Sequence, residues 1–220
     1  MCIRDSSSTL LSAVLMVSVA SAAHAQSAKG GEPAQPPAGQ PAPLTPADQG
    51  WIARIQDTLN GITTLKGRFQ QIAPDGKRST GVVWLDRPGR MRFEYDKPSP
   101  LLLVAGNGKL VFTDSALKQT TEIPLEKTPL GLLLRPNLSL SGDVTVTGLS
   151  HVNGMAQVTL VRTASPSDGS LTVLVSEAPL GLRGWSVVDA QGRETRIDLF
   201  DLATGVAMQP GLFDTTVADQ

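Results

Sequence analysis

The stretch WLDRPGRMRFEYDKPSP, residues 84–100, contains two apolar runs separated by Arg87-Pro88-Gly89. In the second run Met91, Phe93 and Tyr95 alternate with charged side chains. Successive side chains of a strand point to opposite faces of a sheet, so this alternation predicts a half-buried antiparallel strand. The apolar face of that strand must cover something, and Arg87 lies at the turn beside it.

The same period of two recurs on both sides of this stretch. Pro74-Asp75-Gly76-Lys77 predicts a turn between two such runs, and Gly106-Asn107-Gly108 predicts a hairpin between two others. The runs do not alternate with helical segments, so we expect a mainly β (α+β) protein with a single antiparallel sheet and a few helices on one side. About eleven strands are predicted, at 67–73, 81–86, 91–95, 101–105, 109–113, 118–123, 143–149, 155–162, 171–176, 184–190 and 194–202.

Two segments have helical rather than strand character. Thr45-Pro46-Ala47-Asp48 predicts a helix start, with a capping hydroxyl, a proline in the first turn and an acidic side chain at the positive end. An apolar stripe follows at helical spacing, and Asn60-Gly61 predicts the end of the helix. Residues 128–136, TPLGLLLRP, predict a short leucine-rich helical piece between prolines.

The first 46 residues divide into two further segments. The apolar run at 9–25 ends in Ala23-His24-Ala25, which predicts a signal peptide over 1–25 with cleavage after Ala25. The alternative is an N-terminal membrane anchor, although the run is shorter than the ~20 residues of a spanning helix. Residues 26–46 contain six prolines and predict a disordered tether. Residues 47–220 then form one domain of an exported protein.

The composition excludes several classes of function. The only cysteine, Cys2, and one of two histidines, His24, precede the predicted cleavage point. The mature chain would therefore offer no thiol and a single histidine, His151, so we expect no metal site, no cofactor and no Ser-His-Asp triad. A net charge of −1 and a pI of about 6.1 argue against nucleic-acid binding.

Smaller motifs do not change this expectation. Glu94 and Asp96 are two residues apart on a predicted strand and could suggest a glycosidase pair, but we expect them to solvate the outer face, so no catalytic residue is predicted. His151 is expected to be exposed in a turn. The three tryptophans, Trp51, Trp84 and Trp185, are expected to be core residues.

A sheet of this many strands curls, and its concave face must be filled or covered. Aromatic residues make up only 4% of the chain, so Leu, Val, Ile and Met would line that face. The two helical segments either plug the core or form a removable lid over a cavity for acyl chains.

Several blocks of the sequence resemble the family of periplasmic outer-membrane lipoprotein carriers, LolA. Arg87-Pro88 with the alternating residues up to Tyr95 is similar to that family's arginine-proline stretch. Leu103-Val104 and the following 106–110 hairpin, Gln119, the PLGLLL insertion and VVDAQGRETRIDLFDL match later blocks in the same order. The proline-rich segment and an end seven residues after Phe213 depart from the family pattern.

The resemblance implies an unclosed β-barrel of about eleven strands with a helical lid and an apolar interior. It also implies a periplasmic carrier without enzymatic activity. Such a carrier receives triacylated outer-membrane lipoproteins from an inner-membrane lipoprotein-releasing ABC transporter and delivers them to an outer-membrane lipoprotein receptor. We also expect a monomer.

The resemblance further assigns a role to Arg87. In the family, the matching arginine donates hydrogen bonds to backbone carbonyls of the lid and keeps the empty cavity closed, and five N–H donors suit that task. Alternation from Arg87 places a set of side chains on the inner face, provided that the register is not shifted by one residue. The predicted cavity residues are Val83, Leu85, Met91, Phe93, Tyr95, Leu103 and Phe112, and the predicted lid residues are Ile52, Ile55, Leu59, Leu130, Leu133 and Leu134.

Two other functions stay open on the sequence. The same fold could bind or sense another lipid or glycolipid in the periplasm. A hydrolase that uses carboxylates such as Glu94 and Asp96 is the second alternative. The identity of the bound lipid separates the first alternative from the carrier, and turnover separates the second.

Overall fold

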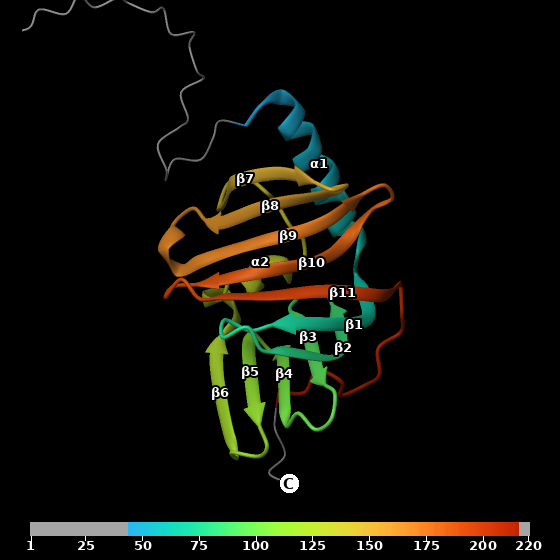
Figure 1. Cartoon of the computed structure of the whole chain (residues 1–220), viewed down its shortest axis with the longest axis vertical. Coiled ribbons are helices and arrows are strands. Elements are labelled where there is room, and N and C mark those ends of the chain that lie inside the picture. Colours follow the sequence, from blue (N-terminus) through green and yellow to red (C-terminus); the bar gives the residue numbers. More distant parts are fainter. Residues whose placement is uncertain (1–43, 216–220) are drawn as a thin grey trace, which may run out of the picture. The chain divides into compact units, whose positions relative to one another are not determined.

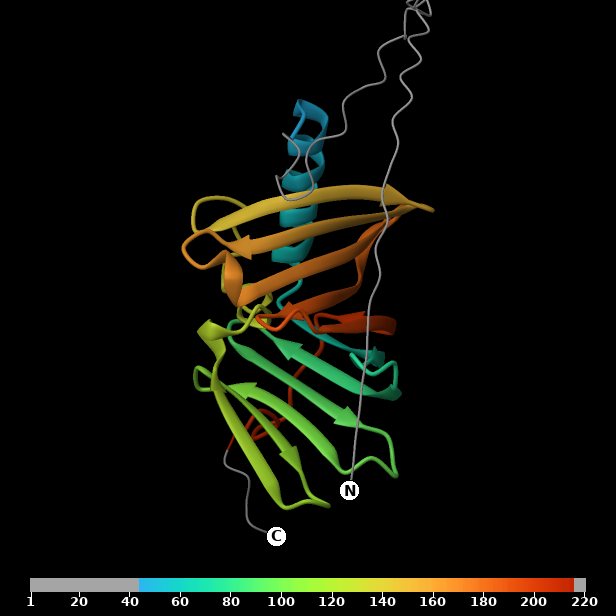
Figure 2. The same cartoon turned by 60° about the vertical axis from the view of Figure 1, so that its left-hand side comes forward.

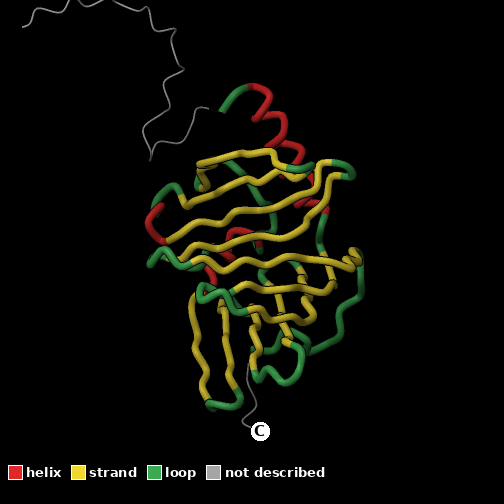
Figure 3. Tube along the Cα trace, in the orientation of Figure 1, coloured by secondary structure: helices red, strands yellow, loops and turns green. Residues whose placement is uncertain are grey.

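The computed structural model of the chain describes residues 44–215. The predicted signal peptide, and the predicted tether up to residue 43, lie outside the described residues. Within them the chain forms one eleven-stranded antiparallel sheet, ordered β6-β5-β4-β3-β2-β1-β11-β10-β9-β8-β7 (Figures 1 and 3). The strands are β1 (Thr64–Ile72), β2 (Arg78–Asp86), β3 (Arg90–Tyr95), β4 (Leu101–Gly106), β5 (Lys109–Asp114), β6 (Gln119–Pro124), β7 (Val144–Val152), β8 (Met155–Arg162), β9 (Gly169–Glu177), β10 (Leu180–Asp189) and β11 (Glu194–Thr204).

The sheet is strongly curved and does not close. Figure 2 shows the strands β7–β10 crossing the direction of β3–β6, with β1 and β11 joining the two halves. Strands β6 and β7 are the two ends of the sheet and do not pair with each other. This is the unclosed barrel with a few helices that the sequence and its resemblance predicted, and the fold class is confirmed.

Helix α1 (Pro46–Gly61) begins and ends where its sequence predicts. The Thr45 hydroxyl accepts a hydrogen bond from the Asp48 amide at 3.2 Å, and the Asp48 carboxylate accepts one from the Thr45 amide at 2.8 Å. This reciprocal capping box satisfies amides that the first helical turn leaves free. The buried side chains of Ile55 and Leu59 face the sheet, where α1 contacts β10.

A second helical segment consists of the short 3-10 helix η1 (Leu125–Lys127) and helix α2 (Leu130–Leu133). Another 3-10 turn, η2 (Pro166–Asp168), connects β8 and β9. Leucines of the α2 region and the apolar side of α1 join the inner face of the sheet in one hydrophobic core. The two helical segments therefore share the concave side, although more than 60 residues separate them in the sequence.

The hairpin of β2 and β3 has the predicted alternation. Met91, Phe93 and Tyr95 are buried, and they pair with Leu85, Val83 and Gly81 of β2. Phe93 and Tyr95 meet the Phe69 ring edge to face, at centroid distances of 4.8 and 5.2 Å. A Cβ atom at Gly81 would lie 2.1 Å from the Glu94 carbonyl oxygen and 2.6 Å from the Phe69 ring, so this aromatic cluster requires glycine there.

Two expectations about single residues are wrong in part. His151 is exposed, as expected, but it lies in β7 rather than in a turn, because the turn follows at Asn153 and Gly154, which have positive φ. The His151 ring is 4.9 Å from the Trp51 ring and its Nδ1 is 2.6 Å from a Glu177 carboxylate oxygen. Of the three tryptophans only Trp185 is a core residue; Trp51 and Trp84 are half-buried beside cationic side chains.

Candidate functional site

The inner face of the sheet contains an apolar cavity of about 380 Å³. This volume lies within the range of roughly 300–1,000 Å³ that is usual for pockets that bind small molecules. Strands from both halves of the sheet and the segment around α2 form its walls. It is lined by Gln71, Phe93, Tyr95, Leu103, Leu110, Phe112, Ile123, Thr128, Pro129, Leu130, Trp185, Val187, Asp189, Thr195 and Ile197.

The cavity has a buried floor and an accessible rim. The floor consists of apolar or aromatic side chains at most 8% exposed, namely Phe93, Tyr95, Leu130, Trp185 and Ile197. Ile123, on the edge strand β6, is 42% exposed and belongs to the rim. A hydrocarbon chain that entered past the rim would therefore be transferred from water into contact with the apolar floor.

The predicted cavity residues fall into two groups. Phe93, Tyr95, Leu103 and Phe112 line the cavity. Val83, Leu85 and Met91 share the inner face but are at most 1% exposed in the closed core, and they are not among the lining residues. They are buried against the rest of the hydrophobic core rather than exposed to the cavity.

Several lining residues were missed from the sequence. Gln71 could have been included, because alternation from the buried Phe69 places it on the inner face of β1. Trp185 was expected to be an ordinary core residue, and it lines the cavity from β10. Ile197 could not have been assigned, since the pairing of β11 with β1 joins segments distant in the sequence.

The turn between β2 and β3 forms hydrogen bonds to both helical segments. The Arg87 guanidinium donates a hydrogen bond to the carbonyl oxygen of Leu59 in α1. The backbone amide of Gly89 donates to the carbonyl oxygen of Leu134, at the end of α2, at 2.8 Å. A single hairpin turn is thus the attachment point for the ends of two covering segments.

The Arg87 guanidinium is largely buried but makes few hydrogen bonds. Its Nε is the one buried side-chain nitrogen or oxygen without a hydrogen-bond partner among residues 44–215. Burial also lowers the pKa of the Arg87 guanidinium below its ordinary value. The resemblance implied that this side chain serves several carbonyls, and among the described residues its guanidinium has one such partner, that of Leu59. A buried cation with unsatisfied donors is a costly arrangement.

The predicted lid residues lie on the concave side of the sheet. Ile55, Leu59 and Leu133 are fully buried, Leu130 and Leu134 are at most 7% exposed, and Ile52 is half-buried against the same core. Of these six residues only Leu130 lines the cavity. The part of the cover that borders the cavity directly is Thr128 to Leu130.

This stretch has an anchor that the sequence did not predict. Arg162, on β8, donates a hydrogen bond from Nη2 to the carbonyl oxygen of Thr128 at 2.7 Å. The Thr128 hydroxyl donates to the Leu125 carbonyl oxygen at 2.8 Å, which fixes the turn before α2. Arg87 and Arg162 therefore hold different parts of the cover, α1 and the segment before α2 respectively.

Helix α1 is also bonded to the segment that follows α2. The Asn60 side chain donates to the carbonyl oxygen of Leu138 at 3.0 Å and accepts from its amide at 2.9 Å. The Gln56 side chain accepts from the Leu140 amide at 2.9 Å. These three bonds link α1 to 138–140, so the two covering segments are connected to each other.

One polar pair lies between the floor and the rim. The Tyr95 hydroxyl donates to Oε1 of Gln71 at 2.7 Å. Burial raises the pKa of Tyr95 to about 12, and the bond to Gln71 opposes this only in part. The hydroxyl is therefore neutral at physiological pH and serves as a hydrogen-bond donor inside an apolar cavity.

Glu94 and Asp96 are engaged elsewhere. The Glu94 carboxylate is 3.2 Å from the Arg92 guanidinium. Asp96 accepts from Arg68 and, at 2.7 Å, from the Thr80 hydroxyl, and these bonds lower its pKa to about 2. Neither carboxylate lines the apolar cavity. Within 44–215, His, Cys, Asp and Glu form no group of three or more that could hold a metal ion.

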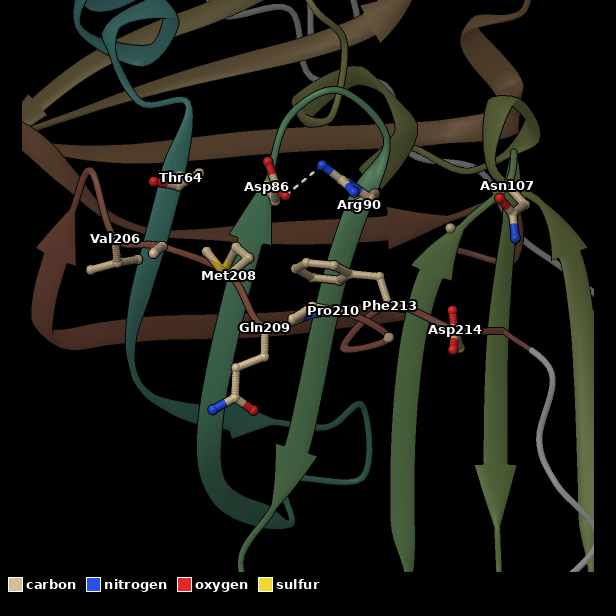
Figure 4. A pocket seen from close by; sticks show the side chains of 13 residues that line it. Thr64, Asp86, Arg90, Asn107, Val206, Met208, Gln209, Pro210, Phe213 and Asp214 are labelled. Atoms are coloured by element: carbon tan, nitrogen blue, oxygen red, sulfur yellow. Dashed lines mark ion pairs between the residues drawn. The ribbon is translucent and has the colours of Figure 1, made fainter.

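A second hollow, of about 510 Å³, lies on the other face of the sheet, beneath the chain segment 206–214 (Figure 4). Asp86 and Arg90 form an ion pair of 2.6 Å at its wall, and the Arg90 guanidinium lies 5.6 Å from the centre of the Phe213 ring. Polar and charged side chains such as Asn107 and Asp214 share this wall with apolar ones (Figure 4). The hollow on the inner face is better suited to a hydrocarbon chain. No helix in the described part of the chain is long and apolar enough to cross a membrane.

Comparison with known proteins connects this architecture to a family. The model of the family described as outer membrane lipoprotein carrier protein LolA matches residues 60–216. An outer-membrane lipoprotein carrier protein of Methylococcus capsulatus is 32% identical over 170 residues, which cover 73% of this chain and 81% of the relative. One of Dechloromonas aromatica is 28% identical over 179 residues, covering 77% and 85%. The crystal structure of a LolA superfamily protein from Nitrosomonas europaea has a TM-score of 0.41 at 12% identity and covers 74% of this chain and 97% of that one. Since the family model spans most of the chain, the chain belongs to the LolA family of outer-membrane lipoprotein carrier proteins.

Proposed function

We propose that this protein carries the acyl chains of lipoproteins through the periplasm. The observation that supports this proposal is the apolar cavity on the concave face, which the segment Thr128 to Leu130 borders. An acyl chain in water costs about 0.8 kcal/mol for each exposed methylene. The three chains of a lipoprotein must therefore be shielded from water while it crosses between the two membranes. Binding alone is sufficient for that task, and the proposed activity needs no covalent chemistry.

The proposed cargo is the class of triacylated lipoproteins destined for the outer membrane. The carrier would receive them from an inner-membrane lipoprotein-releasing ABC transporter and deliver them to an outer-membrane receptor. Membership in the family and the carrier names of its relatives support the carrier role on which this route depends.

The proposed role of Arg87 is to hold α1, and with it the connected segment 138–140, against the concave side of the sheet. Its bond to the Leu59 carbonyl forms when no cargo is present, and cargo entry breaks it as the cover moves away. Among the described residues the buried guanidinium has one carbonyl partner and an unpaired Nε, so release of Arg87 itself sacrifices few hydrogen bonds. Closure after release restores the bond and keeps binding reversible.

The test is intact-mass analysis of the Arg87→Leu protein purified gently from the periplasm of cells that export it. Leucine cannot hold the cover closed, so we expect a co-purifying triacylated lipoprotein. Arg183→Leu is the control, because Arg183 is exposed on β10 and has no ion pair among the described residues. A bound phospholipid or glycolipid instead of lipoprotein would favour the lipid-binding alternative, and an empty variant would contradict the proposed role of Arg87.

A further inference from the structure

The polar end of the apolar cavity has hydrogen-bond donors that are not in use. Gln71 accepts the Tyr95 hydroxyl with its Oε1, but its Nε2 has no partner among the described residues. That amide nitrogen is not buried either, since Arg87 Nε is the one buried unpaired atom in the same range. Thr195 also lines the cavity, and its hydroxyl has no hydrogen-bond partner within 44–215.

These two donors lie on neighbouring strands. Gln71 of β1 pairs with Ile197 of β11, and Thr195 is two residues before Ile197 on the same face of that strand. Diagonal neighbours of this kind are about 7–8 Å apart. A bound molecule could therefore meet both donors at one end of the cavity.

The other polar groups of the cavity are already satisfied. The Asp189 carboxylate accepts from the Gln191 amide at 2.9 Å and from the Arg193 amide and Nε at 3.0 and 2.7 Å. The Thr128 hydroxyl donates to one backbone carbonyl and accepts from the Gly131 amide. No lysine or arginine is among the lining residues. The free donors therefore suit a neutral acceptor better than a phosphate, which proteins usually bind with cationic side chains.

We propose that Gln71 and Thr195 form a subsite for the ester carbonyls of a diacylglyceryl group. An ester carbonyl accepts hydrogen bonds and donates none, so it complements an amide NH₂ and a hydroxyl. With its esters at this end, the acyl chains extend over the apolar floor of Phe93 and Trp185. Gln71 is held in place for this role by the Tyr95 hydroxyl. The subsite rests on the proposed function, since it assumes that the cavity takes acyl chains.

The test compares an ester lipid with its ether analogue. Dioctanoylglycerol and dioctylglycerol ether have the same chains, but the ether lacks the carbonyl oxygens. Each lipid is titrated against purified protein that contains the apolar fluorophore N-phenyl-naphthylamine, and displacement of the fluorophore gives the affinity. We expect the wild-type protein to bind the ester more tightly than the ether by about threefold to tenfold, as one net hydrogen bond would give.

Gln71→Glu is the main variant, because it keeps an oxygen for Tyr95 and removes both amide donors. It should abolish the preference for the ester over the ether at neutral pH or above, and this ratio is measured within the one variant. Gln70→Glu is the matched control, since it makes the same change on the opposite face of β1. Thr195→Val leaves the Gln71–Tyr95 bond intact, so it tests the subsite even if Gln71→Glu folds poorly.

The possible outcomes separate the two proposals. A wild-type protein that binds ester and ether equally would retain the carrier function and overturn the subsite. Ester preference that survives both Gln71→Glu and Thr195→Val would also overturn it. A wild-type protein that binds neither lipid would overturn the carrier function together with the subsite. Loss of ester preference in the cavity variants, but not in Gln70→Glu, would support the subsite.

Discussion

Tyr95 is the only tyrosine of the chain, so its ionisation can be followed without interference from another phenol. Its hydroxyl lies at the polar end of the cavity and is removed from water by the surrounding core. It reports directly on whether the floor of the cavity is dry. A residue with these properties links the packing of the aromatic cluster to the binding chemistry of Gln71.

The titration of Tyr95 provides the first prediction at this scale. Phenolate absorbance should rise with a midpoint near pH 12 in the folded protein, against about 10 in the urea-unfolded chain, because burial disfavours the phenolate. The pKa of Tyr95 is higher in the folded than in the unfolded protein. The contribution of the neutral hydroxyl to the free energy of unfolding is therefore complete below pH 10 and is lost as the pH rises towards 12. A folded-state midpoint at the unfolded value would show that water reaches this hydroxyl freely.

At the scale of elements, the two parts of the cover depend on different arginines. Arg87→Leu should accelerate amide hydrogen exchange in the last turn of α1, because the Leu59 carbonyl loses its bond. Arg162→Leu should instead accelerate exchange at Thr128 to Leu132, where the anchor at the Thr128 carbonyl is lost. Loss of a hydrogen bond to a charged group costs about 1.5–3 kcal/mol, so an increase of roughly tenfold or more is expected in each segment.

Hydrogen exchange followed by mass spectrometry measures both variants, and Arg183→Leu is again the control. The sheet amides of β9 and β10 should exchange as in the wild-type protein. Identical exchange patterns in Arg87→Leu and Arg162→Leu would mean that α1 and the segment around α2 move as one body. Such a result would contradict the assignment of separate anchors.

The elements themselves were predictable, and their assembly was only partly so. Local signals are strong at Thr45-Pro46, at the 74–77 turn and in the alternation of Met91, Phe93 and Tyr95, and each of these is confirmed. The anchor from Arg162 to Thr128 spans 34 positions, and no local pattern indicates it. The unpaired Gln71 donor could not be predicted for another reason. The sequence does not show whether the oxygen or the nitrogen of a glutamine side chain already has a hydrogen-bond partner.

At the scale of the whole molecule, cavity, cover and sheet form one hydrophobic core. A ligand that binds this core in the folded state, and not in the unfolded chain, stabilises the protein by mass action. Dioctylglycerol ether at about 100 times its dissociation constant should raise the free energy of unfolding by about 2.7 kcal/mol. Urea unfolding followed by tryptophan fluorescence measures the change.

Two controls test whether the stabilisation comes from acyl chains bound in the cavity. Glycerol, which lacks acyl chains, should leave the unfolding midpoint unchanged. Replacement of Phe93 by a charged residue should remove the effect of the lipid, since Phe93 forms part of the cavity floor. An equal stabilisation by the lipid in that variant would place lipid binding elsewhere on the protein.

The two unpaired ends of the sheet bear on the size of the lipid that the proposed carrier accommodates. The circumference of a closed barrel is set by the number and stagger of its strands, so a wider load would require broken strand pairs. Here β6 and β7 are the two ends of the sheet and do not pair with each other. For the proposed carrier, we therefore expect β6 and β7 to move apart around a bulkier bound lipid while the backbone ladders between neighbouring strands stay intact.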